Sequence, residues 1–221
     1  MMVVRRERLV YGSEDASYTV RILAPGGGEA ALISAEMINI IELPNGESSR
    51  TIPLDLPEDS APWLAAFNPG GDQLTLVEYQ LFSRDVSVVE VWDVISSSRL
   101  RTFTIPSNRW NTIISAAGDL VAIVTGDLAE KVEVWDTAAA QKRFELPEGL
   151  QYQYSMAFSP DGNLLATQIS DAIVIWETAS GKQIHSMPNR MREEMLLFFS
   201  SDGKLIISLD KGYPMKIWGV P

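Results

Sequence analysis

The sequence predicts an all-β protein assembled from repeated sheets of four short antiparallel strands. Three observations predict this class: tryptophans that recur at a fixed interval, tight turns that keep step with them, and short runs of alternating apolar and polar residues. Alternation with period two, β-branched residues, and Gly, Asp and Pro between the runs are typical of strands. In the best copy, the four expected strands are residues 154–158, 164–168, 173–177 and 182–187.

Four tryptophans end the third expected strand of four repeats. The first follows the alternating run Val89-Glu90-Val91, and the residue after the tryptophan is acidic in three of the four copies. Successive tryptophans are separated by 43, 41 and 42 residues. A constant period in this range is typical of arrays in which each repeat folds as one sheet. The four residues are Trp92, Trp135, Trp176 and Trp218.

A tight turn precedes each tryptophan by 14 to 21 residues. The clearest copies are residues 158–162 and 199–203, in which an Asp-Gly pair ends a polar stretch. Looser copies occupy residues 67–72 and 114–119. Glycine allows the positive φ that such turns require, so these positions indicate the corner between two strands.

A weaker copy of the repeat lies upstream of the other four. A glycine-rich turn occupies residues 25–28, and an apolar run at 38–42 places Ile41 where the later copies have tryptophan. The step from Ile41 to Trp92 is 51 residues, and two longer expected loops, at 54–60 and 79–85, explain the excess. We therefore expect five repeats.

These features together resemble the WD40 repeat family, in the Trp-Asp ending, the Phe-Ser-Pro-Asp-Gly turn and the period near 42 residues. The resemblance covers about residues 61–221, although the Gly-His pair that opens many family repeats is missing. It implies a β-propeller, in which four-stranded sheets called blades surround a channel. It also implies that each tryptophan N–H donates to a second-strand hydroxyl, in the pairs Trp176 with Thr167, Trp135 with Thr125, and Trp218 with Ser208.

A single blade cannot bury its own two faces, so the array has to close or be capped. The last copy reaches only its third strand, near residues 215–218, and the segment Val3–Val10 supplies a spare strand before the first inner strand at 18–23. The resemblance implies that these two segments pair. We therefore expect one domain, residues 1–221, with five blades and a monomeric state if the ring is closed. The alternative is part of a larger ring whose other blades lie on a missing segment or a second copy.

Composition excludes several classes of function. The chain has 18 basic and 29 acidic residues, a net charge of −11, and no basic stripe of the kind that nucleic acids or anionic membranes require. It has no cysteine, which excludes disulfides, thiolate metal sites and cysteine nucleophiles. No apolar run reaches the roughly 18 residues of a membrane span, and no signal peptide is recognisable. We expect a cytoplasmic protein.

Four large side chains occupy equivalent positions, eight residues before the turn glycine. Met, Trp and Tyr often anchor interfaces, so this alignment predicts a ring of partner-binding residues at one mouth of the channel. The alternative is that these side chains pack between blades and meet no partner. The four residues are Trp63, Trp110, Tyr154 and Met195, and the expected neighbouring contacts are Tyr152, Arg109 and Arg190.

No constellation of catalytic residues is evident, and we expect neither a cofactor nor a metal. Glu193 and Glu194 are the only carboxylates expected on inner strands, and adjacent strand residues point to opposite faces. The sequence therefore predicts a non-catalytic scaffold or regulatory module, not an enzyme, that binds a protein or peptide. The alternative is a small-ligand-binding or hydrolytic propeller with a polar or metal site in its channel.

Overall fold

The computed structural model describes residues 20–80, 86–106, 112–125, 131–146, 152–189, 195–210 and 214–220. For residues 152–154, 195 and 210 only the backbone is described. Every regular element in this part of the chain is a β-strand, which confirms the all-β prediction. The same residues include no helix that is long and apolar enough to span a membrane.

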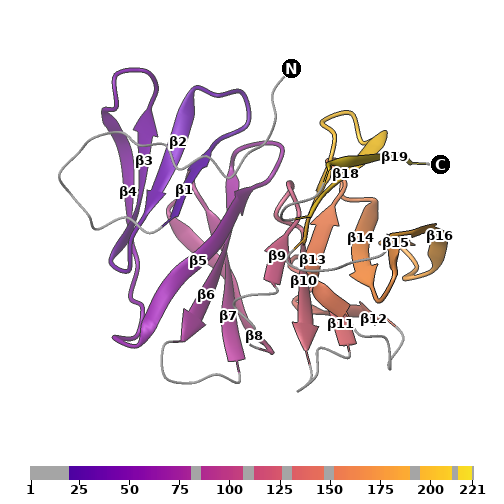
Figure 1. Ribbon diagram of the computed structural model, residues 1–221. Helices are drawn as coiled ribbons and strands as arrows, with labels where there is room; N and C mark the ends of the chain where they lie inside the picture. The colour runs from indigo at the N-terminus through magenta and orange to yellow at the C-terminus, as the bar shows by residue number, and fades with distance from the viewer. Residues whose placement is uncertain are drawn as a thin grey trace.

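The described strands form five antiparallel sheets, called blades 1 to 5 in chain order (Figure 1). Blade 1 contains β1 (Val20–Leu23), β2 (Glu29–Ile33), β3 (Met37–Glu42) and β4 (Ser48–Pro53). Blade 2 contains β5 (Ser60–Phe67), β6 (Gln73–Gln80), β7 (Val86–Asp93) and β8 (Ser98–Pro106). Blade 3 contains β9 (Thr112–Ile114), β10 (Leu120–Thr125), β11 (Lys131–Asp136) and β12 (Gln141–Glu145). Blade 4 contains β13 (Tyr152–Phe158), β14 (Leu164–Ile169), β15 (Ala172–Glu177) and β16 (Gln183–Pro188), and blade 5 contains β17 (Met195–Phe199), β18 (Leu205–Asp210) and β19 (Lys216–Gly219).

A β-bulge recurs at the same place in blades 1 to 4. The pairing of the third strand with the fourth shifts between the tryptophan position and the residue before it. In blades 2, 3 and 4 the residue after the shift is Trp92, Trp135 and Trp176, and in blade 1 it is Ile41. Bulges bend a strand and redirect its side chains. This shared irregularity confirms that the upstream copy is a repeat with Ile41 in the tryptophan position.

The tight turns join the first strand of a blade to the second by a common polar network. In blade 4, the backbone N–H of Leu164 donates to Ser159 Oγ over 2.9 Å, and that hydroxyl donates to Asp161 Oδ1 over 2.5 Å. Ser115 with Asp119 and Ser200 with Asp202 repeat this arrangement in blades 3 and 5. In blade 2 the same role belongs to Asn68 with Asp72.

The core consists of apolar layers between consecutive blades. Successive strand residues point to opposite faces, so a middle blade contributes to two layers. Val121 and Ile123 of β10 pack with residues of blade 2, whereas Leu120, Ala122 and Val124 of the same strand pack with blade 4. Similar layers join blade 1 to blade 2 and blade 4 to blade 5.

A polar contact also joins blades 2 and 3. The backbone oxygen of Gly118 accepts hydrogen bonds from Thr75 Oγ1 of blade 2 and Thr137 Oγ1 of blade 3, each 2.8 Å long. Gly118 has φ of +68°, and a Cβ at this position would lie 3.1 Å from the oxygen of Ala66. Both the backbone angle and the close approach of blade 2 therefore require glycine here.

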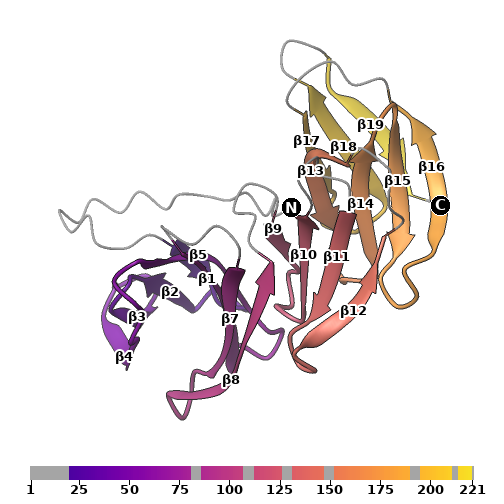
Figure 2. The same cartoon turned by 90° about the horizontal axis from the view of Figure 1, so that it is seen from below.

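In the described part of the chain, the blades follow one another along an arc. The inner strands contact in the order β1, β5, β9, β13 and β17, and in the described part of the chain no comparable contact joins β17 to β1. Figures 1 and 2 show blade 1 and blade 5 at the two ends of this arc. The expected closing strand, Val3–Val10, lies outside the described residues, so its pairing with β19 stays a prediction.

Candidate interaction site

The proposed mouth residues belong to the first strands of their blades. Trp63 lies in β5, Tyr152 and Tyr154 lie in β13, and Met195 begins β17. Each inner strand begins at this end of its blade and runs toward the tight turn, so the backbones of these residues lie on the same side of the arc. The side chains of Tyr152, Tyr154 and Met195, and the whole of Arg109, Trp110 and Arg190, lie outside the described structure.

Trp63 has an unusual position among the described residues. The pairing of β5 with β6 joins Pro62 to Glu78 and Leu64 to Val77, so Trp63 is the extra residue of a β-bulge. Its side chain is half-buried, and its Nε1–H is enclosed without an acceptor among the described groups. A buried donor without a partner costs about 1–3 kcal/mol, so folding alone does not favour this arrangement.

A buried polar cluster crosses blade 2, next to this bulge. Glu90 on β7 accepts from Trp92 Nε1 over 2.9 Å and from Arg99 Nη1 on β8 over 2.5 Å. The Arg99 guanidinium lies 5.7 Å from the centre of the Trp92 ring, within the range of a cation–π contact. Glu78 on β6 lies diagonally across from Glu90, and its Oε1 has no hydrogen-bond partner in the described structure.

The two carboxyl groups of this cluster are removed from solvent. Glu78 is 2% exposed and Glu90 is 3% exposed. Burial, followed by repulsion from the neighbouring Glu90 carboxylate, raises the pKa of Glu78 to about 8. At neutral pH the Glu78 carboxyl group is therefore protonated. A substrate cannot reach carboxyl groups so enclosed, which argues against an acid–base dyad of the glycosidase kind.

The sequence reasoning did not identify this cluster, although a signal for it was present. Glu78 continues the alternation Leu74, Leu76 on the face of β6 that packs toward blade 1. A charged residue that follows core residues at the same two-residue spacing has two explanations. Either the buried part of the strand ends there, or the charged side chain is itself buried. The structure shows the second case, and Glu90 opposite Leu76 lies on the same face.

Of the three predicted tryptophan hydrogen bonds, one is confirmed and two are wrong. Trp176 Nε1 donates to Thr167 Oγ1 over 2.8 Å, as predicted. Trp135 Nε1 donates instead to Glu133 Oε2 over 3.0 Å, because Thr125 pairs with Lys131 and lies too far along β10.

The third predicted pair, in blade 5, has the right register but no hydrogen bond. Ser208 lies two residues from the partner of Trp218 on β18, as Thr167 does relative to Trp176 on β14. Trp218 Nε1 and Ser208 Oγ are nevertheless both enclosed without a hydrogen-bond partner in the described structure. In blade 4, β16 pairs with β15 beside Trp176, whereas in the described part of blade 5 no fourth strand pairs with β19.

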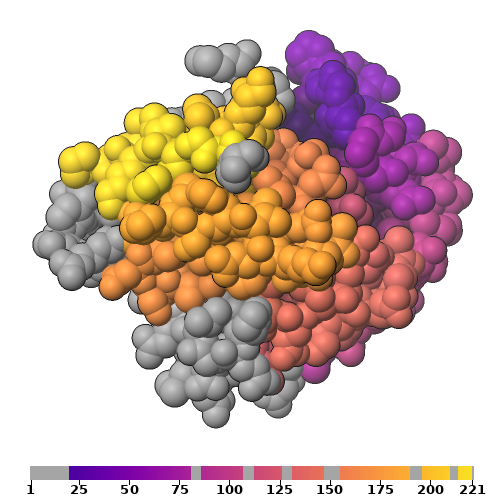
Figure 3. Space-filling model, turned by 90° about the vertical axis from the view of Figure 1, so that its right-hand side faces the viewer, coloured from indigo at the N-terminus to yellow at the C-terminus, as the bar shows by residue number. Residues whose placement is uncertain are grey.

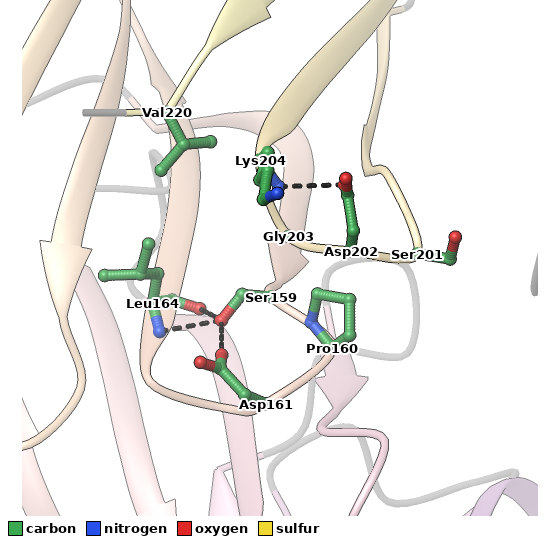
Figure 4. Close-up of a pocket in the computed structure, with 9 residues that line it drawn as sticks. All are labelled: Ser159, Pro160, Asp161, Leu164, Ser201, Asp202, Gly203, Lys204 and Val220. Carbon is green, nitrogen blue, oxygen red and sulfur yellow. Dashed lines mark hydrogen bonds between the residues drawn. The ribbon is translucent and has the colours of Figure 1, made fainter.

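A shallow groove lies at the other end of the blades, between the turns of blades 4 and 5 (Figure 4). Its volume is about 360 Å³. Hydrogen bonds from Ser159 and from the backbone of Asn163 lower the pKa of Asp161, and Ser200 and Lys204 act in the same way on Asp202. Both carboxylates therefore already accept hydrogen bonds from groups within their own turns. The lining residues are Ser159, Pro160, Asp161, Leu164, Ser201, Asp202, Gly203, Lys204 and Val220.

The described residues include no group of three or more His, Cys, Asp or Glu side chains that could hold a metal ion. The carboxylates with polar partners serve turns, tryptophan N–H groups or ion pairs between neighbouring strands. One such ion pair joins Lys142 Nζ on β12 to Glu133 Oε1 on β11 over 3.2 Å.

Comparison with known proteins identifies the fold but not a family. No protein-family model matches the sequence, and no curated protein matches it significantly. Solved structures do match: one is the propeller domain of Cps50 (Swd1) from Myceliophteria thermophila, with a TM-score of 0.64 and 13% identity over 91% of this chain and 70% of that chain. Another is hydrazine synthase from Kuenenia stuttgartiensis, with a TM-score of 0.63 and 16% identity over 90% of this chain and 70% of that one. At this level of identity the likeness concerns architecture alone, and with the repeat markers it shows that the chain has the fold of a WD40-type β-propeller.

Proposed function

We propose that the protein is a non-catalytic interaction module that binds a protein or peptide at the mouth formed by the starts of its inner strands. The fold supports a binding role, because it is shared with a propeller domain in Swd1. The likeness to hydrazine synthase gives no comparable support for catalysis, since Glu78, whose pKa is raised by burial, and its neighbour Glu90 are both shielded from any substrate.

Trp63 is the observation that carries the proposal. It is a large amphipathic side chain, half-buried on an inner strand, and a bulge offsets it from the regular ladder. Residues of this type dominate the binding energy of protein interfaces. The Nε1–H of Trp63 is enclosed without an acceptor among the described groups, which lowers stability. Such a position is better explained by a role in binding than by a role in folding. Trp110, Tyr154 and Met195 at the equivalent sequence positions would extend the same surface.

The test is quantitative affinity capture with the full-length protein, comparing wild type with a Trp63→Ala, Trp110→Ala, Tyr154→Ala triple variant. We expect recovery of a specific partner to fall at least about tenfold, the loss that one anchor residue alone can cause. Ile95→Ala, which trims a side chain that is 68% exposed in a turn of blade 2, is the matched control and should bind normally.

Equal recovery of every captured protein by the triple variant would refute the proposed surface. Because alanine substitutions also weaken packing, circular dichroism has to show native strand content first. A milder Trp63→Phe variant, which keeps an aromatic ring but removes the indole N–H, serves as the second readout if the triple variant unfolds.

A further inference from the structure

One end of the arc has an apolar sheet face that the described structure leaves open. Blade 5 forms this end and lies at the molecular surface (yellow in Figure 3). Six of its large apolar side chains are between 38% and 58% exposed. These residues are Leu196, Phe198, Leu205, Leu209, Met215 and Ile217.

The strand register places these side chains on one face. Leu196 pairs with Leu209, and Ile207 on the same strand pairs with both Phe198 and Ile217. Alternate residues, among them Leu197 and Ile206, point the other way and pack against blade 4. The exposed side chains therefore form a continuous patch across three strands rather than scattered surface residues.

The preceding blade shows what covers such a face. One repeat earlier, Ile173 and Ile175 stand where Met215 and Ile217 stand in blade 5, and both are 0% exposed. Their cover is blade 5 itself, through Leu197 and Ile206. The same sheet face is thus buried by a following blade in blade 4 and left open in blade 5.

We infer that the open face of blade 5 docks a further four-stranded antiparallel blade, apolar on its facing side, that lies outside residues 1–221. This inference extends the proposed binding role to a second surface and rests on that role. The described side chains on the face are all apolar, so the complementary surface is an apolar sheet rather than a charged peptide. The edge of β19, where a fourth strand could pair by backbone hydrogen bonds, is distinct from the apolar face of the sheet. A strand that paired at this edge would not cover the face.

The size of the arc agrees with this occupant. The five described blades cover 70% of the matched Swd1 propeller domain at a TM-score of 0.64. If blades of equal size fill that domain, the share of it that this chain does not cover corresponds to about two blades.

The absence of cysteine makes a direct test possible, because one introduced thiol is the only reactive one. Ile217→Cys places it on the open face. Ile184→Cys is the matched control, since Ile184 on the outer strand of blade 4 is 47% exposed against 54% for Ile217. The probe blades are a second copy of residues 112–189, blades 3 and 4 of this chain, fused after residue 221.

In the unfused protein we expect both thiols to react rapidly with a maleimide. In the fusion, the thiol from Ile217→Cys should react at least about tenfold more slowly, because a docked blade must open before the reagent can enter. The thiol from Ile184→Cys should react at the same rate in both. Ile123→Asp in the added copy alone, on the face that packs toward the preceding blade, should restore fast labelling.

Three outcomes would overturn the inference. Unchanged labelling in the fusion would show that a blade does not fit this face. Labelling in the unfused monomer as slow as that of an Ile175→Cys variant would show that the chain covers its own face. Self-association by light scattering that Ile217→Asp abolishes would identify a second copy as the occupant. All three are independent of the mouth variant, so the two proposals fail separately.

Discussion

Blades 2 and 4 place a tryptophan at the same point of the same repeat but give its N–H different partners. In blade 4 the acceptor is the hydroxyl of Thr167, whereas in blade 2 it is the carboxylate of Glu90. The Glu90 carboxylate also forms an ion pair with Arg99, and it lies beside a second buried acid, Glu78. The repeat therefore fixes where the indole lies, while the second buried acid, Glu78, makes blade 2 responsive to pH.

The largest expected effect is a pH dependence that belongs to blade 2. The folded protein keeps a proton on Glu78 up to a pH of about 8, whereas the unfolded chain releases it near the ordinary pKa of 4.5. The free energy of unfolding should therefore fall by roughly 2–4 kcal/mol as the pH rises from 5 to 9. Urea unfolding at a series of pH values measures this change.

Glu78→Gln should remove most of this decline, because the amide keeps the shape of the side chain and cannot ionise. The variant should be more stable than wild type at pH 9 and similar at pH 5. Glu90→Gln removes the neighbouring charge and should move the midpoint of the decline to lower pH. An unchanged pH profile in Glu78→Gln would contradict the buried pair as its cause.

The hydroxyl acceptor of blade 4 should show an intermediate effect that is independent of pH. Thr167→Val keeps the volume but leaves Trp176 Nε1–H unpaired in the core, at a cost of about 1–3 kcal/mol. The matched substitution in blade 5 is Ser208→Ala, which removes a hydroxyl that has no partner in the described structure and should cost under about 0.5 kcal/mol. Equal losses in thermal unfolding would mean that the two blades are less different than their hydrogen bonds indicate.

Blade 3 should give the smallest effect, because the carboxylate that accepts from its tryptophan is paired near the surface and not in a buried cluster. Its tryptophan also donates to a carboxylate, but Glu133 bonds Lys142, which is 40% exposed in its side chain. Lys142→Met should therefore cost under about 1 kcal/mol, and 1 M salt should reduce that difference further. A larger, salt-independent loss would place this pair with the buried cluster of blade 2.

The repeat could be predicted from the sequence because its markers are local. The turns around Asp161-Gly162 and the run that ends at Trp176 each determine their own geometry, and the predicted strands of blade 4 agree with the structure within two residues. The acceptor of Trp135 could not be found by the same reasoning, because it depends on which residue of β10 lies opposite. The structure pairs Val121 with Trp135, which leaves Thr125 four positions away.

The candidate sites were harder to predict than the fold. Trp63 was identified as a mouth residue, but its bulge depends on how β5 and β6 pair, and no local pattern records that. The open face of blade 5 was not foreseen either. Its residues have the same apolar alternation as the buried faces, so only the arrangement of neighbouring blades distinguishes them.

The contact at Gly118 has a consequence for how this sequence can diverge. The Gly118 carbonyl accepts a hydrogen bond from a hydroxyl of each of two blades, and blade 2 leaves little room for a Cβ. This single residue therefore constrains both the turn in which it lies and the spacing of the two sheets. Elsewhere the repeats tolerate exchange, as Ile41 in place of tryptophan shows. In a set of homologues, variation is therefore expected to spare this glycine together with Thr75 and Thr137, even where the repeat markers themselves have faded.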